Sequence, residues 1–357
     1  MENKLTEKQL NILSKAKEIF GDDLFEKKKE EIINKIKLTY DTEVIDYTGE
    51  MVKELINDII YDSNLFKRCI VPPFSVLDTK QGAWKDRREL LDEYLGYSVV
   101  GREENLTFSK SLKYGEKDKG TSEFNSVLVE IIYKWFGFPG CNVYDPFAGG
   151  HIRGTMAGLL GYKYFGIELA PDQINANIER NKVLKIPNIE WVNDDSLNVD
   201  KYIQDDIVDL IFSCPPYGDL EHYTDDPRDL SNMNYSKFIE TYEEIIKRSC
   251  RKLRNNRFAI FVVGDFRDKD GFYRGFVKDT IIAFRKADLK LYNELILLNN
   301  ITSASLRANK AFINRKMIKI HQNVLVFFKG DNSVIRNIYR EIDSKLPIPT
   351  PKQKNLL

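Results

Sequence analysis

The sequence is poor in histidine and cysteine and carries no excess charge. Among 357 residues there are three histidines and four cysteines, at positions 69, 141, 214 and 250. No two cysteines form a C-x-x-C pair, so we predict no metal site and no disulfide framework. The 54 basic and 54 acidic residues balance. A polyanionic partner must therefore be bound by a local basic patch and not by the molecule as a whole.

Long apolar runs are also missing. No stretch of about 18 apolar residues occurs, so we predict no membrane-spanning helix and no membrane partner. The first twenty residues are charged and lack the apolar segment of a secretory signal. Together with the sparse cysteines, these absences lead us to expect a cytoplasmic protein.

The chain divides into four regions by composition. Residues 1–66 are charged and helical in pattern, and they suit packing, dimerisation or DNA contact. Residues 67–120 contain Pro-Pro and a basic-aromatic cluster around Trp84, typical of either a connector or a lobe that faces substrate. Residues 121–330 form the main domain. The tail 331–357 is rich in proline, and we expect it to fray.

Helices and strands alternate through the main domain. We predict helices at 127–136, 152–160, 172–184, 236–253 and 276–287, and strands at 142–144, 164–167, 189–192, 207–213, 258–263, 291–298 and 323–328. This order predicts an α/β fold with a doubly wound, mostly parallel sheet. The last two strands flank a basic loop without a predicted helix between them, so we expect them to pair antiparallel.

The first motif is VYDPFAGG, where a strand ends and a helix begins. Gly149 and Gly150 allow a sharp turn and a close approach of the backbone to a ligand. The next strand ends at Glu168, where an acid in such folds binds ribose hydroxyls. The motif is neither G-x-G-x-x-G nor a P-loop, which disfavours a dinucleotide or ATP. A tight turn with incidental glycines is the alternative.

The second motif is SCPPY, which follows an apolar strand. Pro215 and Pro216 force an extended backbone and have no N–H to donate, so the Pro215 carbonyl can accept from a substrate. Tyr217 adds a ring that can stack on a base. A simple proline turn is the alternative.

DPFAGG resembles the S-adenosyl-L-methionine motif of amino-group DNA methyltransferases, and SCPPY resembles their catalytic (D/N/S)-P-P-(Y/F/W) motif. With VPPFSVLDTKQGAWKDRR and HQNVLVFFKG, the chain is similar to phage and prophage members, some of which serve restriction-modification. The resemblance covers about residues 70–330. It implies a Rossmann-like methyltransferase fold, S-adenosyl-L-methionine as cofactor and DNA as partner. It also implies methylation at N4 of cytosine or N6 of adenine in a flipped base.

The resemblance also implies roles for individual residues. The catalytic group is Ser213, Cys214, Pro215, Pro216 and Tyr217. The cofactor-binding group is Ser122, Phe124, Asp145, Pro146, Phe147, Ala148, Gly149, Gly150, Glu168 and Asp195. Asp195 fits the contact to the adenine better than its neighbour Asp194. Phe124 suits the core equally well.

Cys214 departs from the family pattern, because a thiol is a weak acceptor. The target base therefore stays open between cytosine and adenine. Ser213 takes over the acceptor role if the strand bends, and the Pro215 carbonyl dominates if it does not. A covalent role for Cys214 fits poorly, since in cytosine-C5 enzymes the cysteine follows the proline.

Basic residues gather between Asn299 and Asn323, where no acid occurs. Phosphate contact suits this group, and a solvated loop is the alternative. Its members are Arg307, Lys310, Arg315, Lys316 and Lys319. Target recognition would fall to this stretch, to residues 67–120 and to the loop 218–235. The turn at Gly264-Asp265 either lines the substrate cleft or is solvated.

Two further functions remain open. The same methyl-transfer chemistry also suits two other substrates, N2 of guanine in RNA and an amide nitrogen in a protein. The other alternative is an inactive module that binds the cofactor and DNA. Cys214 leaves this alternative open, because its thiol is a weak acceptor at a catalytic position. The oligomeric state is open, with a homodimer as one option.

Overall fold

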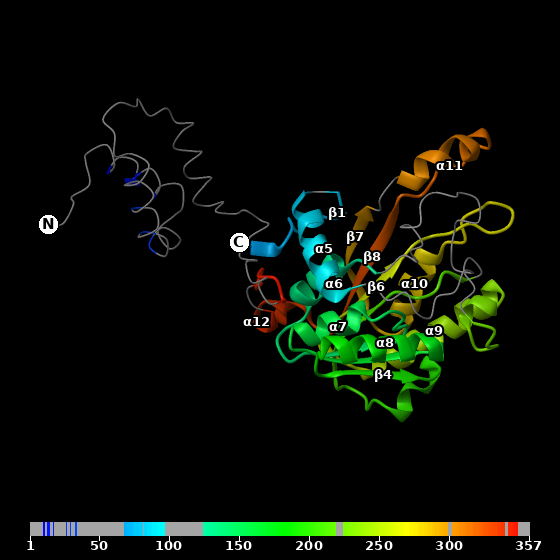
Figure 1. The fold of residues 1–357 in the computed structure, drawn as a ribbon, viewed down its shortest axis with the longest axis horizontal. Helices are drawn as coiled ribbons and strands as arrows, with labels where there is room; N and C mark the ends of the chain where they lie inside the picture. The colour runs from blue at the N-terminus through cyan, green and yellow to red at the C-terminus, as the bar shows by residue number, and fades with distance from the viewer. Residues whose placement is uncertain are drawn as a thin grey trace, which may run out of the picture. The chain divides into compact units, whose positions relative to one another are not determined.

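The computed structural model describes residues 10, 13, 14, 17, 26, 29, 33, 68–80, 82–96, 124–218, 224–298, 302–339 and 342–348 (Figure 1). The chain divides into two units, Met1–Pro72 and Pro73–Leu357. The helices and strands below all belong to the second unit. The predicted helical region 1–66 and the stretch 97–120 lie largely outside the described residues.

Among the described residues, eight strands form one sheet in the order β1-β7-β8-β6-β5-β2-β3-β4. Only β8 runs antiparallel to its neighbours, β6 and β7. The doubly wound, mostly parallel fold and the antiparallel pairing of the last two strands are therefore confirmed. The strands are β1 Val76–Asp78, β2 Asn142–Asp145, β3 Lys163–Glu168, β4 Ile189–Asn193, β5 Val208–Ser213, β6 Leu253–Val263, β7 Lys290–Leu298 and β8 His321–Lys329.

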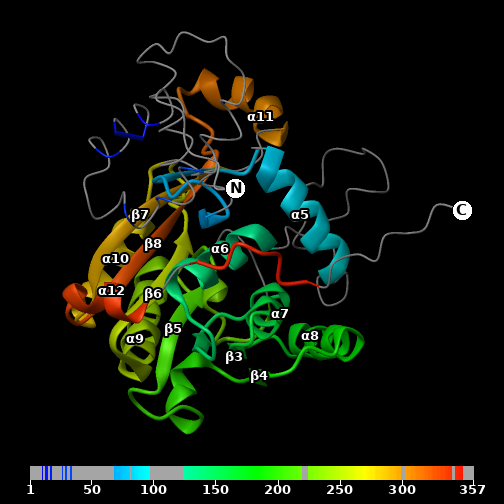
Figure 2. The same cartoon turned by 90° about the vertical axis from the view of Figure 1, so that its left-hand side faces the viewer.

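Helices cover both faces of the sheet, as Figure 2 shows. On one face lie α6 (Ser126–Phe136), α7 (Ile152–Leu159) and α8 (Pro171–Leu184), and on the other lie α9 (Tyr235–Lys252) and α10 (Phe276–Lys286). Helix α5 (Gly82–Leu95) packs on α6. The remaining elements are α11 Thr302–Ile313, α12 Ile335–Ile338 and the short 3-10 helices η2 Ser196–Lys201, η4 Leu230–Asn232 and η5 Asn332–Val334.

The sequence pattern explains how these elements bury the core. All six residues of β5 are buried, as expected for a central parallel strand covered on both faces. Helix α9 buries Phe238, Tyr242 and Ile245, which share one face by their spacing. The rings of Phe284 on α10 and Phe327 on β8 stack with centroids 4.0 Å apart. The sheet and its helices thus form a rigid support for the strand ends.

Three parts of the second unit differ from the prediction. The basic loop after β7 contains helix α11, because residues 302–313 carry no glycine or proline to interrupt it. Strand β1 extends the sheet by pairing with β7. The tail is held as far as the described residues go, since Arg87 and Lys134 donate to the carbonyls of Ser344 and Lys345. Within the described part, no helix is long and apolar enough to cross a membrane.

Candidate functional site

The candidate site lies at the carboxyl edge of the parallel strands, where the order of the sheet reverses. Strand β2 pairs with β3 on one side and with β5 on the other, both in parallel. Ligands of doubly wound sheets bind at such a reversal, outside the carboxyl ends of the strands. The DPFAGG turn after β2 and the CPPY corner after β5 therefore leave the sheet side by side, as the sequence analysis requires.

A buried carboxylate joins these two corners. Asp145 Oδ1 accepts from Ser213 Oγ at 2.5 Å and from the Phe147 backbone N–H at 3.1 Å. Asp145 Oδ2 accepts from Arg153 Nε at 2.6 Å and from the Tyr164 hydroxyl at 2.9 Å. With both oxygens occupied and no exposed surface, Asp145 positions the turn, and its direct contact with a cofactor stays a prediction.

Ser213 also takes part in the internal network. Its side chain is fully buried, and its hydroxyl also accepts from the Phe147 N–H at 3.2 Å. It therefore links β5 to the turn after β2, and its catalytic role stays a prediction. Strand β5 has one register shift against β6, between Val208 and Leu210, and pairs with β6 regularly from Leu210 to Ser213.

Arg153 is a site residue that the sequence analysis missed. Its guanidinium donates to the carbonyls of Phe147 and Ala148 at 2.7 and 3.0 Å, and its carbon lies 4.7 Å from the centroid of the Phe124 ring. Burial works against its charge, but the adjacent Asp145 carboxylate raises the pKa of Arg153 above its usual value. Arg153 thus stays charged and clamps the turn. One feature of the sequence could have identified Arg153. It lies eight residues after Asp145, inside the helix that follows a glycine-rich turn.

The Gly149 turn is tied to the end of β3. Gly149 has φ +50°, and its N–H donates to Glu168 Oε2 at 2.8 Å. Glu168 Oε1 accepts from the Ala170 N–H at 2.9 Å. Burial raises the pKa of Glu168, although these two backbone donors oppose the shift. A Cβ added to Gly149 would make ordinary van der Waals contact, at 3.9 Å, with Arg153 Nη2 and the Phe147 carbonyl oxygen.

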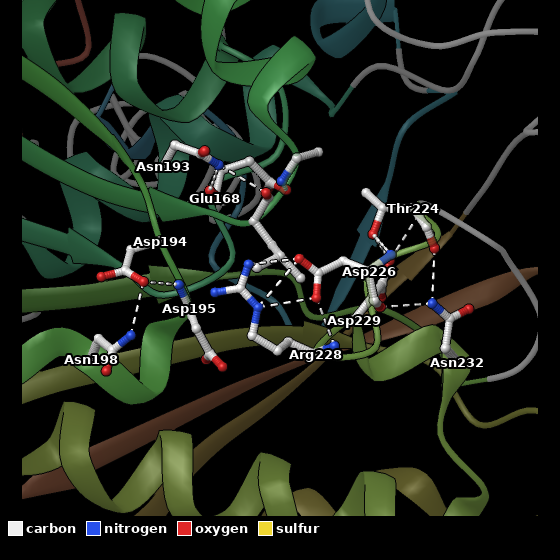
Figure 3. A network of polar contacts seen from close by, with 12 residues as sticks. Glu168, Asn193, Asp194, Asp195, Asn198, Thr224, Asp226, Arg228, Asp229 and Asn232 are labelled. Carbon is white, nitrogen blue, oxygen red and sulfur yellow. Dashed lines mark hydrogen bonds and ion pairs between the residues drawn. The ribbon is translucent and has the colours of Figure 1, made fainter.

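Two adjacent acids after β4 have different environments (Figure 3). Asp194 accepts from the Asp195 N–H, Asn198 and the Tyr202 hydroxyl. Desolvation opposes these hydrogen bonds, which nevertheless lower the pKa of Asp194 to about 2. Asp195 uses Oδ1 to cap η2 through the Leu197 N–H. Both oxygens of Asp194 thus accept hydrogen bonds from its own turn, whereas Asp195 uses only Oδ1 for the cap.

The segment 224–232 lies beside these acids, another feature that the sequence analysis missed. Asp229 shapes the segment by accepting from Thr224 and from the Ser231 N–H. Arg228 pairs with Asp226 at 2.6 Å, and Figure 3 shows its guanidinium directed toward the side of Glu168 and Asp195. The pKa of Arg228 is raised, first by Asp226 and further by the charge of Asp195. Part of the stretch assigned to target recognition therefore borders the predicted cofactor residues.

The CPPY corner follows β5, which lies on the other side of β2 from β3 and β4. Tyr217 is partly buried, with its ring edge-to-face on Phe266 and Phe276. Its hydroxyl accepts from Gln322 Nε2 at 2.6 Å. Pro215 is buried, while Cys214, a thiol, and Pro216 are half-buried. Gln322 at the start of β8 thus fixes the direction of the Tyr217 ring.

Several other predicted residues fall elsewhere. Ser122 lies outside the described residues. Asn125, next to Phe124, caps α6 through the Leu128 N–H. Asp265 does not line a cleft with its carboxylate, because Oδ1 accepts from the N–H groups of Phe266, Gly275 and Phe276 and caps α10. The Pro146 carbonyl accepts from the Ser196 hydroxyl. Gly150, next to Gly149, is half-exposed.

The predicted basic residues are not part of the site itself. Arg307 and Lys310 lie exposed on α11, and Arg315, Lys316 and Lys319 follow it before β8 begins. Because α11 starts just after the carboxyl end of β7, all five are on the same edge of the sheet as the two corners.

No protein-family model and no curated protein sequence matches the chain. Solved structures that resemble it include TrmN from Thermus thermophilus, with 13% identity over 58% of this chain and 49% of that one (TM-score 0.40). An rRNA methylase from Streptococcus thermophilus shares 11% identity over 59% and 100% (TM-score 0.38). A TehB-like SAM-dependent methyltransferase from Corynebacterium glutamicum shares 17% over 57% and 86% (TM-score 0.36). This degree of likeness assigns no activity, so the function is argued from the chain's own residues.

The Asp145 network yields a stability prediction. Asp145→Ala leaves the buried Arg153 without its counter-charge, and we expect the free energy of unfolding to fall by about 3–5 kcal/mol in urea titration. Asp172→Ala removes an exposed acid from the first turn of α8 and serves as control, with an expected loss under about 1 kcal/mol. Equal losses in the two variants would show that the network does not hold the corners together.

Proposed function

We propose that this chain is an S-adenosyl-L-methionine-dependent methyltransferase that modifies an exocyclic amino group of a base in DNA, at N4 of cytosine or N6 of adenine. The observation that carries the proposal is the hydrogen bond between Ser213 and Asp145. It joins a turn suited to a nucleoside cofactor to a Pro-Pro-Tyr corner suited to an amine, at one edge of the sheet. The motif order and the resemblance to amino-group enzymes support the same activity.

The residues at the ends of β2, β3 and β4 fit the cofactor. Glu168, half-buried at the end of β3, is placed for the ribose hydroxyls. Asp195 suits the adenine amino group better than Asp194, whose oxygens serve its own turn. The Gly149 turn, whose positive φ lets the backbone approach a ligand closely, would hold the methionine portion. Arg228 borders Glu168 and Asp195 from the segment 224–232 and would close this end of the site.

The chain's own contribution to the chemistry is positioning and hydrogen bonding. When bound, S-adenosyl-L-methionine supplies a methyl group on a positively charged sulfur, which becomes a neutral thioether as the amine lone pair takes the methyl. An exocyclic amine is a weak nucleophile, because its lone pair is delocalised into the ring. The Pro215 carbonyl would accept one amine hydrogen and localise that lone pair. Tyr217 would support the flipped base with its ring, and the surplus amine proton passes to solvent.

Transfer of a tritiated methyl group from the cofactor tests the proposal. Duplex DNA, denatured DNA, tRNA and ribosomal RNA are offered separately, and the nucleosides are then identified by mass spectrometry. We expect label in DNA as N4-methylcytosine or N6-methyladenine, which also decides the base that Cys214 leaves open. Label as N2-methylguanine in RNA would refute the DNA assignment. Cofactor binding without transfer to any acceptor would indicate an inactive module.

Tyr217 separates catalysis from cofactor binding. Tyr217→Ala removes the ring expected to support the base, and we expect transfer to fall at least a hundredfold, or about 2.7 kcal/mol in barrier. The affinity for S-adenosylhomocysteine, measured by calorimetry, should change less than threefold. Tyr217→Phe keeps the ring and loses only the contact with Gln322. Its transfer rate should therefore lie between the rates of the wild type and of Tyr217→Ala. Parallel loss of cofactor binding in the alanine variant would contradict this assignment.

Glu168 gives a pH dependence with a definite sign. Burial raises its pKa above 4.5, so the carboxyl takes up a proton at a higher pH than an ordinary glutamate. Only the carboxylate accepts from both ribose hydroxyls, so S-adenosylhomocysteine should bind more weakly as the pH falls through that raised pKa. Glu168→Gln should bind at least tenfold more weakly at pH 8 and lose this pH dependence. The exposed Glu190→Gln serves as control and should behave like the wild type.

A further inference from the structure

The segment between β7 and β8 projects from the carboxyl edge of the sheet. We call residues 302–320, which comprise α11, the turn 314–315 and the returning stretch 316–320, the α11 arm. Figures 1 and 2 both place α11 beyond the ends of β7 and β8. Twelve helical residues span about 18 Å, and the five residues 316–320, if extended, can return over about the same length. The far end of α11 therefore forms the tip of a finger-like projection.

The base of the arm is fixed beside the CPPY corner. Gln322, two residues after the arm ends, donates to the Tyr217 hydroxyl at 2.6 Å. Burial lowers the pKa of Lys319, and the nearby Asp265 carboxylate opposes that shift. Lys316 lies over Gly271, where an added Cβ would fall 2.1 Å from its Nζ. The arm thus stands next to the residue that is expected to support the substrate base.

The tip is apolar and exposed. Phe312 and Ile313, the last residues of α11, are 49% and 77% exposed, and Met317 on the return is 60% exposed. Arg315 has the left-handed φ of +54° that ends the helix, and its guanidinium lies 4.8 Å from the Phe312 ring centroid. The Lys316 N–H donates to the Ala311 carbonyl and closes this helix end. The apolar tip is therefore a defined structure with no apolar cover among the described residues.

The stem of the arm is basic, and the sequence 300–322 contains no acid. Arg307 and Lys310 are one helical turn apart on α11 and exposed. This charge is complementary to a polyanion and would oppose close approach of a second basic arm. Exposed apolar side chains on a basic support suit the groove of a nucleic acid duplex, where phosphates surround an apolar base stack.

We propose that the α11 arm grips duplex DNA through its basic stem and inserts Phe312 and Ile313 into the base stack beside the flipped nucleotide. This inference rests on the proposed function, since it names how a duplex would yield a base to the CPPY corner. An apolar wedge fills the space that a flipped base leaves and lowers the cost of its extrusion. Arg307 and Lys310 contact the phosphates on either side of that position.

Unwinding of a closed circular plasmid tests the insertion without requiring methyl transfer. A topoisomerase relaxes the plasmid in the presence of the protein, and the change in linking number is read on a gel. We expect the wild type to unwind the plasmid. The double variant Phe312→Ala/Ile313→Ala should unwind it at least threefold less at equal occupancy. The matched control Ile178→Ala/Val183→Ala removes two exposed apolar side chains from α8 and should unwind like the wild type.

Two further measurements complete the test. In a methyl-transfer assay, the ratio of duplex to denatured DNA labelling should fall at least tenfold in the tip variant, because a single strand needs no wedge. Arg307→Ala/Lys310→Ala should reduce the slope of log affinity against log salt by about 2. The basic stem and the apolar tip are thus assessed by separate readouts.

Several outcomes would overturn the proposal. Equal unwinding by the tip variant and the wild type, or plasmid binding without unwinding, would exclude insertion. A wild-type dimer in sedimentation that becomes monomeric in the tip variant would show that the tip meets a second copy of the chain. Unwinding that depends on the tip, with no methyl transfer to DNA, would instead uphold the arm and refute the proposed function.

Discussion

The site depends on one buried ion pair, between Asp145 and Arg153. A carboxylate without exposed surface is stable as an ion only when its oxygens are occupied, and here four donors occupy them. These donors come from the turn after β2, from α7, from β3 and from the end of β5. The charge therefore fixes the position of the turn and α7 relative to β3 and to the end of β5, which lies 68 residues further along the chain.

That constraint determines what the neighbouring residues are able to do. Because Asp145 and Ser213 satisfy each other inside the protein, the proposed function relies on Glu168 and Asp195 for the nucleoside and on the Pro215 carbonyl for the amine. Asp194 and Asp195 show the same principle at closer range. They are adjacent in sequence, yet the Asn198 and Tyr202 side chains bond both oxygens of Asp194, whereas Asp195 uses only Oδ1 for its cap.

The antiparallel strand β8 connects the α11 arm to the CPPY corner. A helical crossover would have returned the chain to the far edge of the sheet, but β8 runs back between β7 and β6. Its first residues consequently start at the carboxyl edge, where Gln322 reaches Tyr217. The same reversal leaves α11 projecting from that edge, so a DNA-binding arm and a base pocket would share one side of the molecule.

The sequence by itself determined the alternation of helices and strands, the two glycine- and proline-rich corners and their order along the chain. Those features follow from local periodicity and from the backbone limits of Gly149, Pro215 and Pro216. Only the tertiary structure decided which polar groups remain for ligands, because hydrogen bonding inside the protein occupies Asp145 and Ser213. It also decided that Arg153, Arg228 and Gln322 border the site. Their contacts join residues up to 105 positions apart, which no local pattern encodes.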